Sequence, residues 1–122
     1  MRSTRRSVAH HDLWHDNLLV DETGALAGVL EFVHLEITDP AHDVAAPHLF
    51  GPTFVEHLLA AYRHHGGHFT DEERHRMHRY WEAWPLGGLA WAIDHDDRLE
   101  TAAAIRRLRA GPILRGAGSG AP

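Results

Sequence analysis

The spacing of apolar residues changes along the chain and predicts a small sheet followed by several helices. Short apolar runs over residues 17–20 and 27–32 flank a polar turn sequence at 21–24, a pattern that is typical of a β-hairpin. From residue 54 onward, apolar residues recur every three or four positions, as they do on one face of a helix. The pattern therefore predicts an α+β protein that is mostly helical.

Capping residues and glycines indicate where the helices begin and end. Thr70 and Glu73 have the spacing of a capping box, in which each residue satisfies a backbone N–H of the other. Asp39 precedes Pro40 as an N-cap does at a helix start, and Gly111 stops the last helix. We expect helices over residues 40–49, 54–65, 70–93 and 98–109, with disturbances at Pro47 and Pro85 and with Leu99, Ile105 and Leu108 facing inward.

Composition limits the classes of protein to which the chain can belong. Its 122 residues suffice for one domain, and the formal net charge of -5 argues against a nucleic-acid-binding protein. No apolar run reaches the roughly 18 residues that a membrane span requires, and the absence of cysteine fits a cytoplasmic protein without disulfides. We expect a flexible lead-in over residues 1–7 and a disordered tail over residues 112–122.

Polar residues with a characteristic spacing lie in the first third of the chain. His10, Asp12 and Asn17 follow the pattern His-x-Asp-x-x-x-x-Asn. Glu31 comes at the end of the second predicted strand, and the segment Asp39-Pro40-Ala41-His42-Asp43 follows it. A carboxylate beside a hydroxyl group can orient it and take its proton, and amide and carboxylate oxygens are ligands that suit Mg²⁺.

This order of motifs resembles the aminoglycoside phosphotransferase family, the small-molecule branch of the kinase-like fold. The resemblance is specific over residues 8–48 and looser beyond them. It implies the C-terminal lobe of that fold over residues 8–111, with the catalytic loop and hairpin at 8–32 and helices at 40–111. It also implies ATP-dependent phosphorylation of a small-molecule hydroxyl group, with Mg²⁺ as cofactor and the hairpin at the edge of the active site.

The same resemblance implies a role for each matching residue. Asp12 matches the catalytic base, and Asn17 and Glu31 match the metal ligands. Because the family has Asp at the position of Glu31, the carboxylate here stands one methylene further from the backbone. His11 takes the place of a frequent Gly in the loop. The residues that match those bracing the family's catalytic loop are His10, Asp39 and Asp43.

The position of the loop near residue 12 leaves a second hypothesis open. Kinase-like enzymes carry a Gly-rich loop and a nucleotide-binding Lys on an N-terminal lobe, and this sequence contains no Lys. We therefore expect a C-terminal lobe alone, as a fragment, a misassigned start or a short relative. The alternative to an impaired enzyme is a non-catalytic structural or interaction remnant. Partners would be an unidentified small-molecule acceptor and either a missing N-terminal lobe or a second copy of the chain.

Histidines at residues 10–15 and 64–68 raise the alternative of a zinc site. Neither group has the spacing of a known zinc motif, such as HExxH or a Cys/His framework. Adventitious binding of zinc or nickel is the expectation that we prefer.

Overall fold

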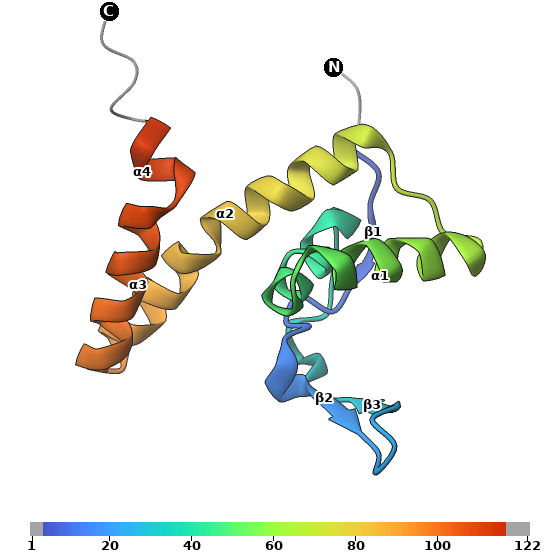
Figure 1. Ribbon diagram of the computed structural model, residues 1–122, viewed down its shortest axis with the longest axis horizontal. Helices are drawn as coiled ribbons and strands as arrows, with labels where there is room; N and C mark the ends of the chain where they lie inside the picture. Colours follow the sequence, from blue (N-terminus) through green and yellow to red (C-terminus); the bar gives the residue numbers. More distant parts are fainter. Residues whose placement is uncertain (1–3, 117–122) are drawn as a thin grey trace, which may run out of the picture. The chain divides into compact units, whose positions relative to one another are not determined.

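The computed structural model describes residues 4–116, which fall into two compact units (Figure 1). Residues 1–78 form the first unit and residues 79–122 the second, and the boundary between them lies inside the range 8–111 that was predicted as one lobe. Helices and short antiparallel strands confirm the mostly helical α+β class. Within the described residues, no helix is both long enough and apolar enough to cross a membrane.

Two antiparallel strand pairs form the sheet structure of the first unit. β1 (Ser7–Ala9) pairs with β4 (Glu36–Thr38), and β2 (Leu18–Val20) pairs with β3 (Leu26–Val29) as the predicted hairpin. The first pair was not predicted, because its strands are far apart in sequence.

The ordered structure begins earlier than the sequence predicted. Ser7 belongs to β1 and lies opposite Thr38, so the predicted flexible lead-in over residues 1–7 is wrong at its C-terminal end. Arg6 also donates a hydrogen bond to the carbonyl oxygen of Ile37, at 2.7 Å. These contacts join residues that are about thirty positions apart, and no local pattern marks them.

A single aspartate organises the turn of the β2–β3 hairpin. Asp21 Oδ1 accepts hydrogen bonds from Thr23 N, Thr23 Oγ1 and Ala25 N, at 2.8, 2.6 and 3.0 Å. The side-chain bond from Thr23, followed by the two backbone bonds, lowers the pKa of Asp21. Gly24 completes the turn with a φ of 83°. This conformation is unfavourable for any residue with a Cβ atom.

Gly24→Ala is therefore expected to lower the free energy of unfolding by about 1 kcal/mol, because the added Cβ atom disfavours the positive φ. No heavy atom lies within 4 Å of that Cβ position, so the loss is conformational and not a clash. Gly87→Ala is the matched control, since Gly87 lies inside a helix and its Cβ position is also open. Urea denaturation should show Gly87→Ala unchanged or more stable by about 0.5–1 kcal/mol. Equal effects of the two substitutions would contradict this explanation.

Short helices connect the strands to the first long helix. Two 3₁₀-helices, η3 (Pro40–Val44) and η4 (Ala46–Phe50), replace the single helix predicted over residues 40–49. Pro47 lies at the start of η4, where its missing N–H does not break a helical hydrogen bond. α1 (Pro52–His64) follows and ends before Gly66, as predicted.

Small apolar residues dominate the core of the first unit. They allow the short helices and strands to approach closely, which large side chains would prevent. The buried apolar residues of this unit are Ala9, Ala41, Val44, Ala45, Ala46, Val55, Leu59 and Met77.

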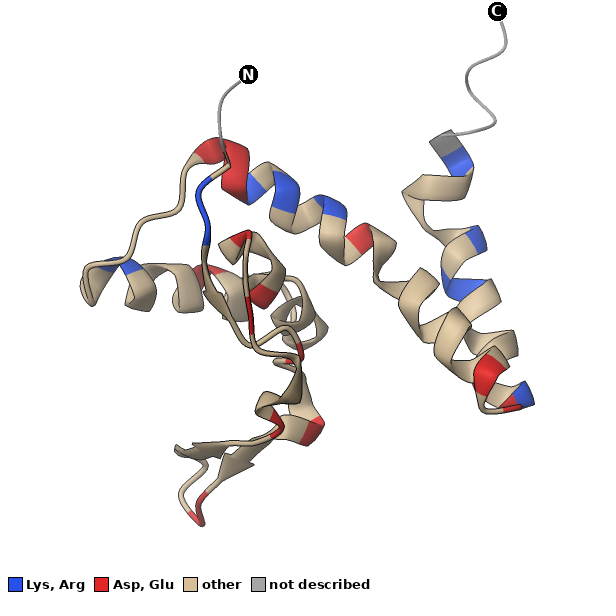
Figure 2. Ribbon diagram, turned by 180° about the vertical axis from the view of Figure 1, so that it is seen from behind, with Lys and Arg blue, Asp and Glu red and all other residues tan. Residues whose placement is uncertain are grey.

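The capping box at the start of α2 (Asp71–Asp94) is confirmed. Glu73 N donates to Thr70 Oγ1 at 3.1 Å, and Thr70 N donates to Glu73 Oε2 at 2.8 Å. Acidic residues fill the first turn, where their negative charges interact favourably with the positive end of the helix dipole (Figure 2). Pro85 lies inside this helix without ending it.

The second unit consists of the last part of α2, α3 (Arg98–Ala110) and α4 (Pro112–Gly116). Arginines follow one another along α3 and α4 (Figure 2). Leu108 is buried as expected, but Leu99 is 86% exposed, so its predicted inward orientation is wrong. The two leucines are nine positions apart, which places them on opposite sides of a helix with 3.6 residues per turn.

The predicted disordered tail is partly helical, because α4 covers residues 112–116. Residues 1–3 and 117–122, which include the ends of the predicted lead-in and tail, lie outside the described residues.

Candidate functional site

Asp12 and Asn17 close a loop between β1 and β2 by side-chain hydrogen bonds. Asn17 Nδ2 donates to the Asp12 backbone oxygen at 2.8 Å and to Asp12 Oδ2 at 2.9 Å. Asn17 is only 6% exposed, whereas Asp12 is partly exposed. Within residues 4–116, Asp12 Oδ1 and Asn17 Oδ1 accept no hydrogen bond, so both oxygens are available to a ligand.

Asp43 holds the backbone at the start of this loop. Its Oδ2 atom accepts the N–H of His10 and its Oδ1 atom accepts the N–H of His11, both at 2.8 Å. A carboxylate that receives two backbone N–H groups fixes their direction, since each charge-assisted bond is short and strong. Asp43 lies in η3, so the bonds join the loop to a helix more than thirty residues away.

The His10 side chain joins the loop to the residue that precedes Glu31. His10 Nδ1 accepts the backbone N–H of Asp12 at 3.1 Å, which assigns the proton to Nε2. His10 Nε2 then donates to the Leu30 carbonyl oxygen at 2.7 Å. Leu30 N in turn donates to the Asn17 carbonyl oxygen at 2.8 Å, so Leu30 is tied to both ends of the loop.

Glu31 therefore lies directly beside residues that contact the loop of Asp12 and Asn17. Leu30 precedes it, and Phe32 follows it with its ring 4.8 Å from the His10 ring in an edge-to-face arrangement. Glu31 is exposed, and no described residue bonds to its carboxylate. Its φ of 60° and ψ of 67° place it in the left-handed region, which Asp and Asn adopt more readily than Glu.

Asp39 makes different contacts from Asp43. Its Oδ1 atom accepts the N–H of Ala41 at 3.1 Å as the N-cap of η3, and both oxygens accept hydrogen bonds from Arg76. A direct role of Asp39 in bracing the loop stays a prediction. Arg76 was not among the site residues predicted from the sequence, although its position three residues after Glu73 places both on one face of α2.

The structure also shows two features that the sequence left undetermined. His11 adopts a φ of 74°, so it keeps the left-handed backbone that Gly would favour at this position of the loop. The Leu30 carbonyl oxygen accepts the hydrogen bond from His10, and a backbone acceptor cannot be predicted from the type of its residue. Both features shape the loop around Asp12.

The donor atoms of this site suit a hard cation better than zinc. Asn17 Oδ1 and the carboxylates of Asp12 and Glu31 are oxygen donors, and Mg²⁺ commonly takes one or two carboxylates with phosphate and water oxygens. In the part of the chain that the structure describes, no group of three or more His, Asp or Glu residues is arranged to hold a metal ion. The histidines at 10–15 and 64–68 form no such group there.

His42 lies next to the loop and carries a perturbed pKa. Its ring centroid is 4.7 Å from that of His11. Burial lowers the pKa of His42 below its ordinary value and the charge of His11 adds to this effect, whereas nearby carboxylates oppose it. The neutral imidazole is therefore favoured in the folded chain.

This shift predicts that acid destabilises the folded state through His42. As the pH falls below about 6.5, the unfolded chain binds a proton at His42 before the folded chain does. The free energy of unfolding therefore decreases until the pH reaches the lowered pKa of the folded chain. Urea denaturation at about pH 7.5 and 5.5 should show a smaller loss of stability for His42→Gln than for the wild type. An identical loss in both proteins would contradict the assignment to His42.

The chain is similar in sequence and in structure to known proteins. Residues 1–80 match the phosphotransferase enzyme family, APH. A protein of Bacillus subtilis (strain 168), described as uncharacterized protein YcbJ, is 28% identical over 81 residues, which are 66% of this chain and 26% of that protein. A solved structure of a macrolide 2'-phosphotransferase type I is similar with a TM-score of 0.71 and 27% identity, over 84% of this chain and 35% of that chain. The chain thus spans about a quarter of the first protein and about a third of the second.

Proposed function

Because this chain belongs to the phosphotransferase enzyme family, we propose that it carries the catalytic loop of an ATP-dependent enzyme that phosphorylates a small-molecule hydroxyl group. The observation that carries the proposal is the pair of hydrogen bonds from Asn17 Nδ2 to Asp12. One bond holds the Asp12 backbone oxygen and the other holds Oδ2, which leaves Oδ1 available to a substrate.

Asp12 has the position and chemistry of the group that receives the acceptor's proton. Its Oδ1 atom can accept a hydrogen bond from the acceptor hydroxyl and so aim the hydroxyl oxygen at the γ-phosphorus of ATP. As the new oxygen–phosphorus bond forms, the bond to the departing ADP breaks and the hydroxyl proton passes to Asp12. Positioning dominates this chemistry, because little covalent work is left to the protein in a loose transition state.

Asn17 and Glu31 are the residues that would hold Mg²⁺. Asn17 Oδ1 faces no donor among the described residues, and the Glu31 carboxylate is exposed beside the loop. When bound, the metal ion would neutralise charge on the phosphate groups. Glu31 has a longer side chain than the family's Asp, so we expect it to hold the ion with less favourable geometry.

The remaining part of the nucleotide site would come from outside these 122 residues. The family resemblance places a Gly-rich loop and a Lys on an N-terminal lobe, and this chain spans only about a third of the similar solved structure. We therefore propose that the 122-residue chain alone binds ATP weakly and acts as one part of the enzyme. Calorimetry with ATP and Mg²⁺ tests this point, and micromolar affinity for the chain alone would contradict it.

The experiment that tests the function measures the transfer of labelled phosphate from ATP to a panel of hydroxyl compounds. The panel includes aminoglycosides, macrolides, choline-like compounds and sugars, and the chain is assayed alone and with an added N-terminal lobe from a relative. Transfer that requires Mg²⁺ and the Asp12 carboxylate would support the proposal. Transfer to no compound under either condition would instead favour a non-catalytic remnant of the fold.

A further inference from the structure

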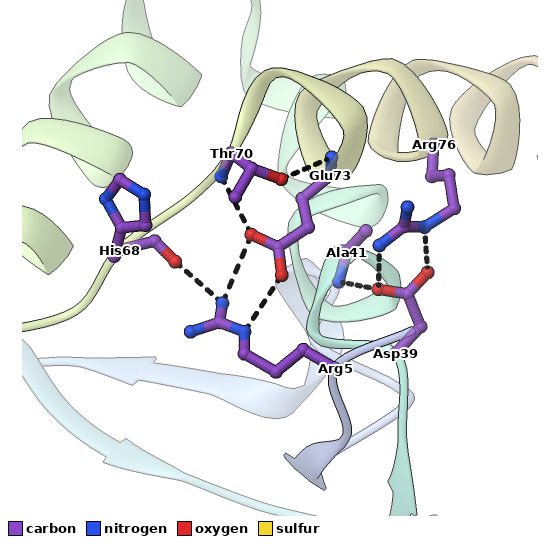
Figure 3. Close-up of polar contacts among 7 residues, drawn as sticks. All are labelled: Arg5, Asp39, Ala41, His68, Thr70, Glu73 and Arg76. Carbon is purple, nitrogen blue, oxygen red and sulfur yellow. Dashed lines mark hydrogen bonds and ion pairs between the residues drawn. The ribbon is translucent and has the colours of Figure 1, made fainter. Parts of the chain in front are cut away.

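Arg76 binds the residue at which β4 passes into η3. Its Nε atom donates to Asp39 Oδ2 at 2.5 Å and its Nη2 atom donates to Asp39 Oδ1 at 3.3 Å (Figure 3). The Asp39 side chain is 8% exposed and that of Arg76 is 29% exposed, so solvent screens this pair only partly. A two-pronged Arg–carboxylate contact fixes direction as well as distance.

One helical turn earlier, Glu73 binds the residue that leads into β1. Arg5 Nε donates to Glu73 Oε1 at 2.8 Å and Arg5 Nη2 donates to Glu73 Oε2 at 3.3 Å (Figure 3). Arg5 also donates to the His68 carbonyl oxygen at 2.6 Å. Glu73 is 3% exposed, and its carboxylate accepts the Thr70 N–H as well.

These two contacts act on the same end of one strand pair. β1 and β4 are antiparallel with Ser7 opposite Thr38, so Arg5 and Asp39 both lie just beyond that end of the pair. β1 runs into the catalytic loop at its other end, and β4 runs into η3, which carries Asp43. The direction of η3 decides where the Asp43 carboxylate meets the N–H groups of His10 and His11.

We propose that Glu73 and Arg76, on the first turns of α2, position the catalytic loop, and that Arg76 sets the place of Asp12 through Asp39, η3 and Asp43. This inference rests on the proposed function for its effect on catalysis. Arg76 binds Asp39, which is neither the proposed base nor a proposed metal ligand, so Arg76 would act as a positioning residue. Its removal should displace the loop backbone more than it loosens the rest of the unit.

A purely stabilising ion pair would behave differently. If Arg76 only stabilised the unit, its loss would weaken the protection of all slowly exchanging amides by the same factor, through global unfolding. A positioning role instead predicts a selective loss of protection at the amides of His10 and His11, which Asp43 binds. Amide hydrogen exchange at these residues separates the two roles without any assay of activity.

The test compares Arg76→Gln and Arg76→Lys with the control Arg74→Gln. Arg74 lies on the same helix and forms an exposed pair at 3.0 Å with Glu56, which belongs to α1. We expect Arg76→Gln to reduce protection at His10 and His11 about tenfold more than at the buried amides of Val55 and Leu59 in α1. Arg76→Lys should recover part of that protection, because it restores the charge but not the two-pronged contact. Arg74→Gln should leave the ratio unchanged.

Two further measurements keep the proposal falsifiable. If Arg76→Gln does not fold, the double variant Asp39→Asn/Arg76→Gln removes both charges of the pair. This variant should still show a selective loss of amide protection at His10 and His11. In the phosphate-transfer assay, Arg76→Gln should lower kcat about tenfold or more with little change in the KM for the acceptor. Equal loss of protection across all amides would overturn the positioning role.

The outcomes also separate this proposal from the proposed function. A selective loss of protection without any transfer activity in the wild type would support the positioning and contradict the phosphotransferase. Arg76→Gln could instead keep the Asp12-dependent transfer and normal exchange at His10 and His11. That result would contradict the positioning role of Arg76 but not the phosphotransferase function.

Discussion

Asp12→Asn is expected to lower kcat for phosphate transfer by about 10²- to 10⁴-fold and to leave the fold intact. The asparagine side chain has nearly the same volume and keeps an oxygen that can accept the hydrogen bond from Asn17 Nδ2, at 2.9 Å in the wild type. It lacks the carboxylate charge and cannot take the proton of the acceptor hydroxyl. Steady-state kinetics with the best acceptor measures the loss, and circular dichroism with urea denaturation verifies the fold.

Asp16→Asn is the matched control for this prediction. Asp16 lies in η1 (His15–Asn17) and is exposed, and its carboxylate Oδ1 atom lies 3.0 Å from Nε2 of His15. The same chemical change four residues away should therefore alter kcat less than twofold. If Asp16→Asn and Asp12→Asn lowered kcat equally, loss of charge in the loop would explain the effect, and Asp12 would not be the base.

Asp43→Asn is expected to lower the free energy of unfolding by about 2–3 kcal/mol. The carboxylate accepts two backbone N–H groups, each at 2.8 Å, and an amide offers only one oxygen. The amide nitrogen of the new side chain would face the second N–H group, which would lose its partner. Urea denaturation measures the change, with the slope of the transition compared to detect altered unfolding behaviour.

Asp16→Asn serves again as the control, because the contact of the Asp16 carboxylate with His15 is exposed and its loss should cost less than about 0.5 kcal/mol. A wild-type midpoint for Asp43→Asn would contradict the view that this carboxylate holds the loop. Hydrogen exchange at His10 and His11 would then also remain unchanged.

Local signals explain why parts of the fold could be predicted from the sequence. The turn at residues 21–24 fixes the hairpin, because Asp21 and Gly24 supply the acceptor and the positive φ that it needs. The capping box of Thr70 and Glu73 fixes the start of α2 in the same way. In each case the interacting residues lie within four positions of one another, so their spacing alone carries the information.

Long-range contacts account for what the sequence did not predict. The pairing of β1 with β4 and the bond between Arg76 and Asp39 join residues about thirty or more positions apart, with no local pattern to mark them. The boundary between the two units lies within α2, where the helix continues without a break. Leu99 was misplaced because it lies nine positions before the buried Leu108, so the two side chains face opposite sides of the helix and cannot both meet the core.

The candidate site lies between these two cases. The spacing of Asp12 and Asn17 predicted a loop, and the structure joins them directly by hydrogen bonds. The route from His10 to Leu30, and so to Glu31, passes through a backbone carbonyl oxygen. The role of Asp12 as the base and the roles of Asn17 and Glu31 as metal ligands stay predictions, which kinetic measurements with substrate test.

That Asp12, Asn17 and Glu31 form one phosphate-transfer site is tested most directly by the dependence of the transfer rate on Mg²⁺ concentration. We expect Glu31→Asp to reach half of its maximal rate at a several-fold lower Mg²⁺ concentration than the wild type, since Asp restores the shorter reach and suits the left-handed backbone. Asn17→Ala should require more Mg²⁺, and Glu22→Asp, an exposed control in the hairpin turn, should match the wild type. If Glu31→Asp and Asn17→Ala both follow the wild-type curve, the two residues are not metal ligands and the site is not the one described.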